Sequence, residues 1–213
     1  MLCIEIKSRW NDLEIEVAVP DRIEGRKMSR LFPKEFTLKN GKKLMVREAR
    51  EKDAKDLLVF TQDILREDEF YITTLEDLSE KLTVEQTEER IQKHLNEANW
   101  CYLIAVLGGH IVGQIHLWNG HRKRIEHVCQ LAINVLKKYR GLGVGTALME
   151  SAIAWAQDNA VIEKLAFGVF PDNETALGLY RKMGFVEEGR KVKEVKFGQG
   201  KYKDCILMYR FVK

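Results

Sequence analysis

The stretch Leu131–Thr146 reads LAINVLKKYRGLGVGT and predicts more about the fold than any other part of the chain. It begins as a mostly apolar run rich in branched residues, which indicates a buried strand ending near Val135. Glycines then recur at alternate positions, at Gly141, Gly143 and Gly145. The residues that follow have apolar side chains at helical spacing. The order is therefore strand, glycine-rich turn and helix.

A turn of this kind is suited to binding phosphate groups. Glycine adopts the positive φ angles of tight turns and lets backbone N–H groups approach a ligand closely. The first N–H groups of the following helix have no intrahelical acceptor, and the helix dipole makes that end positive. Lys137, Lys138 and Arg140 add positive charge beside it. We therefore expect a phosphate-bearing ligand here.

Three kinds of phosphate-binding turn can be compared with this one. A P-loop has Lys and then Ser or Thr after its last glycine, whereas Gly145 is followed by Thr146 and Ala147. A dinucleotide-binding fold has Gly-x-Gly-x-x-Gly directly after the strand. Here the spacing is Gly-x-Gly-x-Gly, and five residues separate Val135 from Gly141. The remaining interpretation is a loop that holds the diphosphate of coenzyme A.

Outward from this stretch, strand and helix patterns follow one another. Residues 2–7 and 13–19 alternate apolar and charged side chains, which predicts a hairpin, and 20–33 is polar and aperiodic like a linker. The pairs Asn40-Gly41 and Asn119-Gly120 each predict a tight turn between strands. In all we expect strands at 36–46 (a hairpin), 100–107, 111–118, 125–135, 164–170, 185–186 and 205–212, and helices at 53–67, 84–98, 145–158 and 173–183. This order predicts an α+β fold in which helices flank a mixed, mostly antiparallel sheet.

The composition is that of a globular protein. The 213 residues, 24.7 kDa, correspond to one domain or to one domain with an added segment. Hydrophobic residues make up 45% and charged residues 31%, which argues against disorder. The longest apolar run, Cys101–Leu107, is far shorter than the roughly 20 residues of a membrane-spanning helix. The N-terminus lacks the basic and apolar regions of a secretory signal, so no membrane association is expected.

The cysteines and histidines predict neither disulfides nor a metal centre. The 4 cysteines include no Cys-x-x-Cys pair, and their density is far below that of a disulfide scaffold. Reduced thiols and a cytoplasmic location are therefore expected. His116, His121 and His127 come nearest to a ligand set, and they lack zinc-ligand spacing. We expect no metal.

Two motifs make the chain resemble a known family. Arg140, Gly143 and Gly145 fill the pattern Arg/Gln-x-x-Gly-x-Gly/Ala. Farther along, 173–185 reads NETALGLYRKMGF, at the distance expected for a second motif. Both motifs are similar to those of the GNAT superfamily of N-acetyltransferases, whose members bind acyl-CoA.

The resemblance runs from about Phe36 to Val212. It implies a GNAT acyl-CoA acyltransferase fold at 36–213, with an N-terminal extension, a hairpin plus linker, at 1–35. Whether that extension adds strands to the sheet or mediates a homodimer is left open.

The resemblance also implies how acetyl-CoA would bind. In the family the strand that ends at Val135 splays from the next strand, 164–170, and the pantetheine arm lies in the V between them. The arm would pair with the backbone around Ile133 and Val135, and Asn173 would lie near it. The residues implied for the diphosphate are Arg140 and the backbone N–H groups of Gly141, Leu142, Gly143, Val144, Gly145 and Thr146.

The resemblance implies a general acid but leaves the base open. Tyr180 matches the family tyrosine beside the thioester sulfur, where a phenol can protonate the departing thiolate. Some relatives use a glutamate on the strand before Asn173 to deprotonate the amine, and the matching position here is Gly168. His127 is the first substitute, because an imidazole titrates near neutral pH, and Glu126 is another. A water chain or an amine that arrives partly neutral would also serve.

The predicted function is transfer of an acetyl group from acetyl-CoA to a primary amine, directly within a ternary complex. A covalent acyl-enzyme on Cys129 is less favoured, because nothing in the sequence marks an activated thiol. A non-catalytic acyl-CoA sensor on the same fold is the alternative from a different class.

Charge bears on the partner. The net charge of +3 divides into −4 for 1–99 and +7 for 100–213. The basic part lacks the interleaved aromatic residues of a nucleic-acid site, so no nucleic acid is expected. Residues 61–97 hold 11 acidic and 4 basic residues. From this excess we expect a cationic acceptor, a small amine or a protein N-terminus.

Overall fold

The computed structural model describes residues 31–67 and 83–213. The strands are β1 (Lys34–Thr37), β2 (Lys43–Glu48), β3 (Cys101–Leu107), β4 (His110–Asn119), β5 (Val128–Val135), β6 (Lys164–Val169), β7 (Val186–Gly198) and β8 (Lys201–Phe211). The helices are α1 (Ala54–Glu67), α3 (Val84–Asn96), α4 (Val144–Asp158) and α5 (Glu174–Lys182), with short 3₁₀ turns η1 (Glu51–Asp53) and η2 (Lys137–Tyr139). The hairpin predicted at 2–7 and 13–19 lies outside the described residues. The predicted domain begins at 36, and β1 starts two residues earlier, at Lys34.

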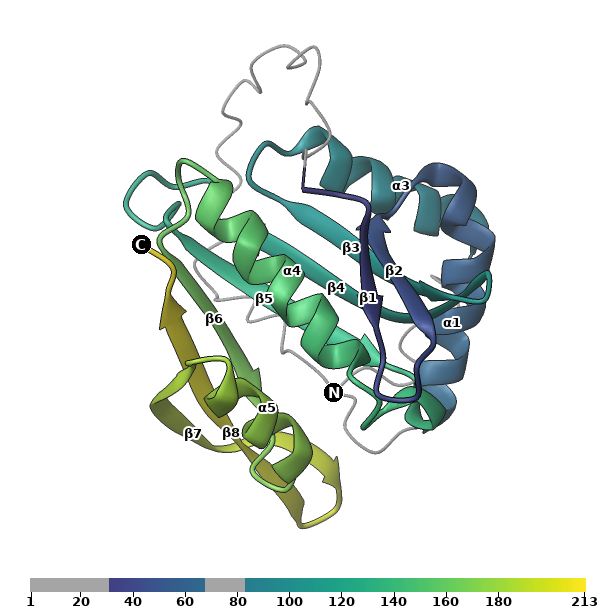
Figure 1. Cartoon of the computed structure of the whole chain (residues 1–213). Helices are drawn as coiled ribbons and strands as arrows, with labels where there is room; N and C mark the ends of the chain where they lie inside the picture. The colour runs from purple at the N-terminus through teal and green to yellow at the C-terminus, as the bar shows by residue number, and fades with distance from the viewer. Residues whose placement is uncertain (1–30, 68–82) are drawn as a thin grey trace.

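All these strands form one sheet in the order β1-β2-β3-β4-β5-β6-β8-β7. Neighbouring strands are antiparallel except β5 and β6, which are parallel. Figure 1 shows that β6, followed by β8 and β7, diverges from β5, so the sheet divides visibly between β5 and β6. The predicted α+β class with a mixed, mostly antiparallel sheet is confirmed.

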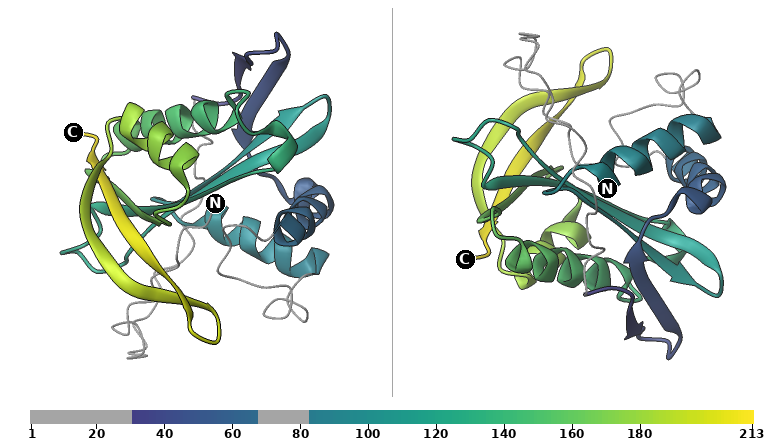
Figure 2. Two further views of the ribbon diagram at one scale, coloured as in Figure 1. Left: turned by 90° about the horizontal axis from the view of Figure 1, so that it is seen from below. Right: turned by 90° about the horizontal axis from the view of Figure 1, so that it is seen from above.

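The helices cover the two faces of the sheet separately (Figure 2). α4 and α5 lie on one face, over a core that includes Leu131 and Ile133 of β5. α1 and α3 lie on the other face, over a second core that includes Tyr102 and Ile104 of β3. Because successive strand side chains point to opposite faces, one apolar strand supplies both cores. The α1/α3 face is called the second face below.

Two of the predicted turns have a different form. The first hairpin is closed by Leu38–Lys42: Leu38 N–H donates to Lys42 O (2.9 Å), and Lys42 N–H donates to the side chain of Asn40 (3.2 Å). Only Gly41 of the Asn-Gly pair has a positive φ, +79°. Asn119-Gly120 does not turn the chain tightly either, because Asn119 still pairs with Cys129 and a loop lies between.

The closing pair of strands is much longer than the sequence suggested. β7 and β8 span 13 and 11 residues, whereas the prediction gave most of this region to a loop. β7 is an edge strand and is exposed along nearly its whole length, so its sequence needs no apolar alternation. The charged side chains on such an edge are those expected to discourage pairing with another chain.

Candidate active site

β5 and β6 are bonded to each other over only part of their length. The parallel pairing starts at Val128 and ends with Gln130 opposite Ala166. β5 continues to Val135, paired with β4, and β6 continues to Val169, paired with β8. The strands therefore separate beyond Gln130 and leave a V in the sheet (Figure 1), with its apex at this last pair.

The backbone of β5 presents hydrogen-bonding groups to this V. Leu136 N–H donates to Val112 O on the β4 side, at 3.1 Å. In an antiparallel pair the backbone groups of successive residues point to opposite edges of the strand. The groups of Ile133 and Val135 therefore face the V, although Val135 O already accepts a hydrogen bond from Arg140 Nε. An extended ligand can pair with the remaining groups as an added strand would. Ile133 and Val135 are the two residues predicted to bind the pantetheine arm.

The glycine-rich turn joins the open end of β5 to α4. Gly141 and Gly143 have φ angles of +76° and +105°, which favour glycine, and Gly143 directly precedes the helix. The first hydrogen bond of the helix runs from Ala147 N–H to Gly143 O, at 3.0 Å. The N–H groups of Val144–Thr146 thus have no acceptor within the helix, and they lie at the positive end of the helix dipole. They are three of the backbone groups of Gly141–Thr146 that were predicted, with Arg140, to hold a diphosphate.

Neighbouring elements hold this turn from two sides. Lys39 N–H, in the β1–β2 turn, donates to Leu142 O at 3.0 Å. A Cβ on Gly145 would lie 3.3 Å from Leu179 Cδ2 of α5, so close packing of α4 against α5 accounts for this glycine. Gly143 is different: its nearest neighbour would be Leu38 Cδ2 at 3.8 Å, and its φ angle is what requires glycine.

Arg140 is turned toward the protein. Its Nε donates to Val135 O at 3.0 Å, and its Nη2 donates to Glu67 Oε2 at 2.9 Å. The same carboxylate accepts from Lys137 N–H through both oxygens, at 2.8 and 3.0 Å. Two of the guanidinium nitrogens therefore hold the loop together, a role that the sequence did not indicate.

Asn173 and Tyr180 are both on or next to α5. Asn173 is the N-cap of this helix, and its side-chain oxygen accepts from Ala176 N–H at 3.2 Å. Tyr180 is 0% exposed. Its ring meets Phe167 edge-on, with centroids 4.4 Å apart. Phe167 is the first residue of β6 beyond the last pair with β5, so Tyr180 lies next to the apex of the V.

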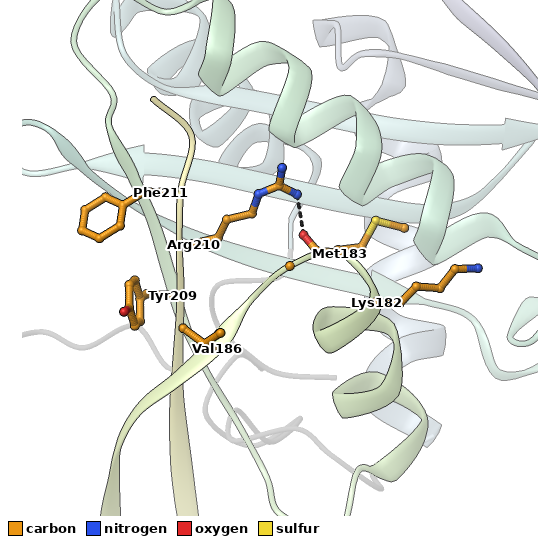
Figure 3. Close-up of a pocket in the computed structure, with 7 residues that line it drawn as sticks. Lys182, Met183, Val186, Tyr209, Arg210 and Phe211 are labelled. Carbon is orange, nitrogen blue, oxygen red and sulfur yellow. Dashed lines mark hydrogen bonds between the residues drawn. The ribbon is translucent and has the colours of Figure 1, made fainter.

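The turn after α5 is tied to β8. Arg210 Nη1 donates to Met183 O, one of the carbonyls that a helix end leaves without an intrahelical donor. Figure 3 shows Arg210 reaching from β8 to this turn. Arg210 and Met183 line a cavity of about 590 Å³, together with residues that include Lys182 and Tyr209. No residue predicted for catalysis or cofactor binding lines this cavity. The hydrogen bond from Arg210 to Met183 helps to fix α5, the helix that carries Tyr180.

Glu126 and His127 are placed on the other side of the apex. Both precede β5, which begins at Val128 rather than at 125 as predicted. Their carbonyls are used locally: Asn119 Nδ2 donates to Glu126 O (2.7 Å), and Lys164 N–H donates to His127 O (3.1 Å). His127 lies three residues before the apex at Gln130, and three extended residues span about 10 Å. Tyr180 lies beyond the apex, so the structure does not bring His127 together with it.

Cys129 is buried beside the apex and is poorly suited to attack a thioester. It is 0% exposed, and burial raises the pKa of its thiol well above the ordinary value, which a hydrogen bond involving Trp118 only partly offsets. A protonated thiol is a weak nucleophile. We expect Cys129→Ala to keep kcat/KM within about twofold of the original. Intact-protein mass spectrometry after mixing with acetyl-CoA alone should show no acetyl adduct, and an adduct lost in the variant would contradict direct transfer.

A chain of polar side chains on the second face was not foreseen. Tyr102 OH donates to Gln114 Oε1 at 2.6 Å, and Gln114 Nε2 donates to Asn134 Oδ1 at 3.3 Å. The His116 ring stacks on Tyr102 with centroids 3.8 Å apart. Burial, with the nearby charges of His94 and Arg90, lowers the pKa of His116 well below its ordinary value, so the ring is neutral.

These polar residues give the second face a different character from the α4 face. Asn134 brings the chain to β5 beyond the apex, next to the V. A sequence signal was present: Gln114, His116 and Asn134 are polar residues in otherwise apolar strands. Such positions usually need a buried partner. Gln114 and Asn134 bond to each other, and His116 packs against the rings of Tyr102 and His94.

Within 31–67 and 83–213, no group of three or more His, Cys, Asp or Glu side chains is arranged to hold a metal ion. Among the helices described, none is long and apolar enough to cross a membrane.

A divided sheet with a glycine-rich helix N-terminus at the open end of the division is the arrangement that the resemblance to acyl-CoA-dependent acetyltransferases predicts. A sequence profile of the Acetyltransferase (GNAT) family matches residues 59–185. The chain belongs to this family and is an acetyltransferase.

Individual relatives agree with this assignment. A crystal structure of a GNAT-family acetyltransferase from Streptococcus pneumoniae is 34% identical, with a TM-score of 0.75 over 79% of this chain and 99% of that one. The L-amino acid N-acetyltransferase AaaT of Escherichia coli is 32% identical over 108 residues, 51% of this chain and 66% of that protein. An N-alpha-acetyltransferase of Sulfurisphaera tokodaii is 27% identical over 157 residues, 70% and 84% of the two chains.

The residues present fit acetyl-CoA, which the family uses. The amides that precede the α4 ladder suit a diphosphate, and the β5 backbone groups that face the V suit the amides of a pantetheine arm. Gly141 adds to the fit, because a Cβ there would find nothing within 4 Å and the backbone is open to a ligand.

Proposed function

We propose that this acetyltransferase moves an acetyl group from acetyl-CoA directly to a primary amine, with both substrates bound together. The observation that carries the proposal is the V between β5 and β6, with the α4 N-terminus at its open end and Tyr180 at its apex. Holding the thioester and the amine in one opening removes much of the entropic cost of their encounter.

The chemistry assigns a task to each part of the V. The amine nitrogen attacks the thioester carbonyl, a C–N bond forms, and the carbonyl oxygen becomes an oxyanion that a backbone N–H on the open edge of β5 can stabilise. The C–S bond then breaks, and the phenol of Tyr180 gives its proton to the departing thiolate. The proton lost by the amine passes through water, with His127 and Glu126 as the predicted relay groups, and restores the phenol. The products are the N-acetylated amine and the CoA thiol.

The acceptor enters, in this proposal, from the second face, because α4 occupies the other face of β5. The expectation of a cationic acceptor came from the acidic residues of 61–97. In the described helices Asp63 pairs with Arg66, and Glu67 binds the cofactor loop, so these two carboxylates have partners inside the protein. We propose a small cationic amine or a protein N-terminus, and the relatives add an L-amino acid as a third class to test.

The test is acetyl-CoA-dependent thiol release against a panel of amines. The panel holds a polyamine, L-amino acids and a short peptide with a free N-terminus, with an N-blocked form of each as control. Release with one class and none with its blocked form would identify the acceptor class and confirm transfer to nitrogen. Binding of CoA with no release above hydrolysis for any amine would overturn the proposal and leave the acyl-CoA sensor.

A further inference from the structure

Glu67 is the last residue of α1, and it contacts the start of the cofactor loop from 70 residues away in sequence. Its two carboxylate oxygens both accept from Lys137 N–H, at 2.8 and 3.0 Å. One of them, Oε2, also accepts from Arg140 Nη2, at 2.9 Å. A single carboxylate thus binds both the first residue of η2 and the residue that follows η2.

This contact closes a small ring of interactions around the loop. Lys137 N–H is the first amide of a 3₁₀ turn, so it has no acceptor within that turn, and Glu67 supplies one, as an N-cap residue would. Arg140 then connects Glu67 to Val135 O, at the end of β5. The residues between the end of β5 and Gly141 are therefore held in one arrangement by a side chain from α1.

Electrostatics argue that this role is structural rather than ligand-binding. A carboxylate repels a diphosphate, and placing one beside the loop would weaken anion binding if it were unpaired. Arg140 neutralises it, and both side chains are partly shielded, at 30% exposed for Arg140 and 22% for Glu67. The pair therefore adds little net charge to the site and acts by fixing geometry.

We propose that Glu67 is a positioning residue for the cofactor diphosphate. It holds Lys137–Arg140 so that the amides of Gly141–Thr146 converge on one anion, and it joins that loop to α1, a helix of the second face. Arg140 serves mainly as part of this brace. The inference rests on the proposed function, because it concerns the same cofactor loop.

The test compares two acetyl donors. S-acetyl-pantetheine has the thioester and the pantetheine arm but no diphosphate, so it does not need the loop. For Glu67→Ala we expect the KM for acetyl-CoA to rise about 5- to 10-fold, as for the loss of a charged hydrogen-bonding group, with kcat nearly unchanged. The kcat/KM for S-acetyl-pantetheine should stay within about twofold. Glu67→Gln should lie between, because its amide oxygen still accepts from Lys137 N–H while the charge opposite Arg140 is lost.

Asp63→Asn is the matched control. It removes one carboxylate from the same helix, together with an ion pair to Arg66, but makes no contact with the loop. Its KM values for both donors should equal those of the original protein. Melting temperatures of all three variants show whether each is folded, and Glu67→Gln decides the question if Glu67→Ala is not.

Equal losses with both donors, or an unchanged KM for acetyl-CoA in folded Glu67→Ala and Glu67→Gln, would overturn the inference. Failure of the proposed function looks different, because the unmodified protein would then transfer acetyl from neither donor to any amine.

Discussion

Replacing Tyr180 with phenylalanine is expected to lower kcat by about 100-fold, in the range usual for loss of a general acid, while acetyl-CoA affinity is retained. The substitution removes only the hydroxyl. The ring can keep its edge-on contact with Phe167, at 4.4 Å between centroids, so the core around the apex is preserved. The thiolate would then leave without its proton donor. Steady-state kcat and the Kd for CoA from calorimetry measure the two effects separately.

Tyr209→Phe is the control for this experiment. Tyr209 lies on β8 beside the cavity near Met183, with Lys164 Nζ 4.8 Å from its ring centroid, and it has no place in the proposed chemistry. Its kcat should be unchanged. If Tyr180→Phe also leaves kcat unchanged, the complete burial of Tyr180 is explained by packing alone, and another group must protonate the thiolate.

The features that sequence predicted well are those with local causes. The turn into α4 could be located because a φ angle of +105° at Gly143 favours glycine, and because the apolar spacing of α4 begins directly after it. The C-terminal end of α5 was marked in the same way by Gly184, with a φ of +78°. Each signal lies within a few residues of the structure it specifies.

The features that sequence missed depend on distant residues. No local pattern marks Glu67 as the partner of Lys137, because only the fold brings the end of α1 to η2. β7 beyond Val186 was assigned to a loop, because a strand at the sheet edge buries neither face and so needs no alternation. Glu126 and His127 were assigned to a strand that in fact starts after them, because Ile125 resembles a strand residue but lies in a turn, with Val128 N–H donating to Ile125 O.

Gly143→Val should produce the largest loss of cofactor affinity, about 30-fold or more in the Kd for CoA. A β-branched residue at a φ of +105° is strained by roughly 2 kcal/mol, and the turn can relieve that strain only by moving its amides away from their present directions. Because the proposed cradle consists of those amides, binding of the diphosphate should be lost before the fold is. Calorimetry with CoA measures the loss of diphosphate binding. Kinetics with S-acetyl-pantetheine, which has no diphosphate, show whether the rest of the site is still folded.

The control that isolates this effect is Gly178→Ala on α5. That glycine has an ordinary helical φ, and a Cβ there would meet nothing within 4 Å, so alanine should leave the affinity for CoA unchanged. Comparing the two substitutions removes the general effect of losing a glycine and leaves the effect of the left-handed conformation at the loop. Gly143→Val protein that melts normally and still binds CoA as tightly as the original would show that the diphosphate is held elsewhere. In that case the positive end of α4 would be a feature of the fold and not of the site.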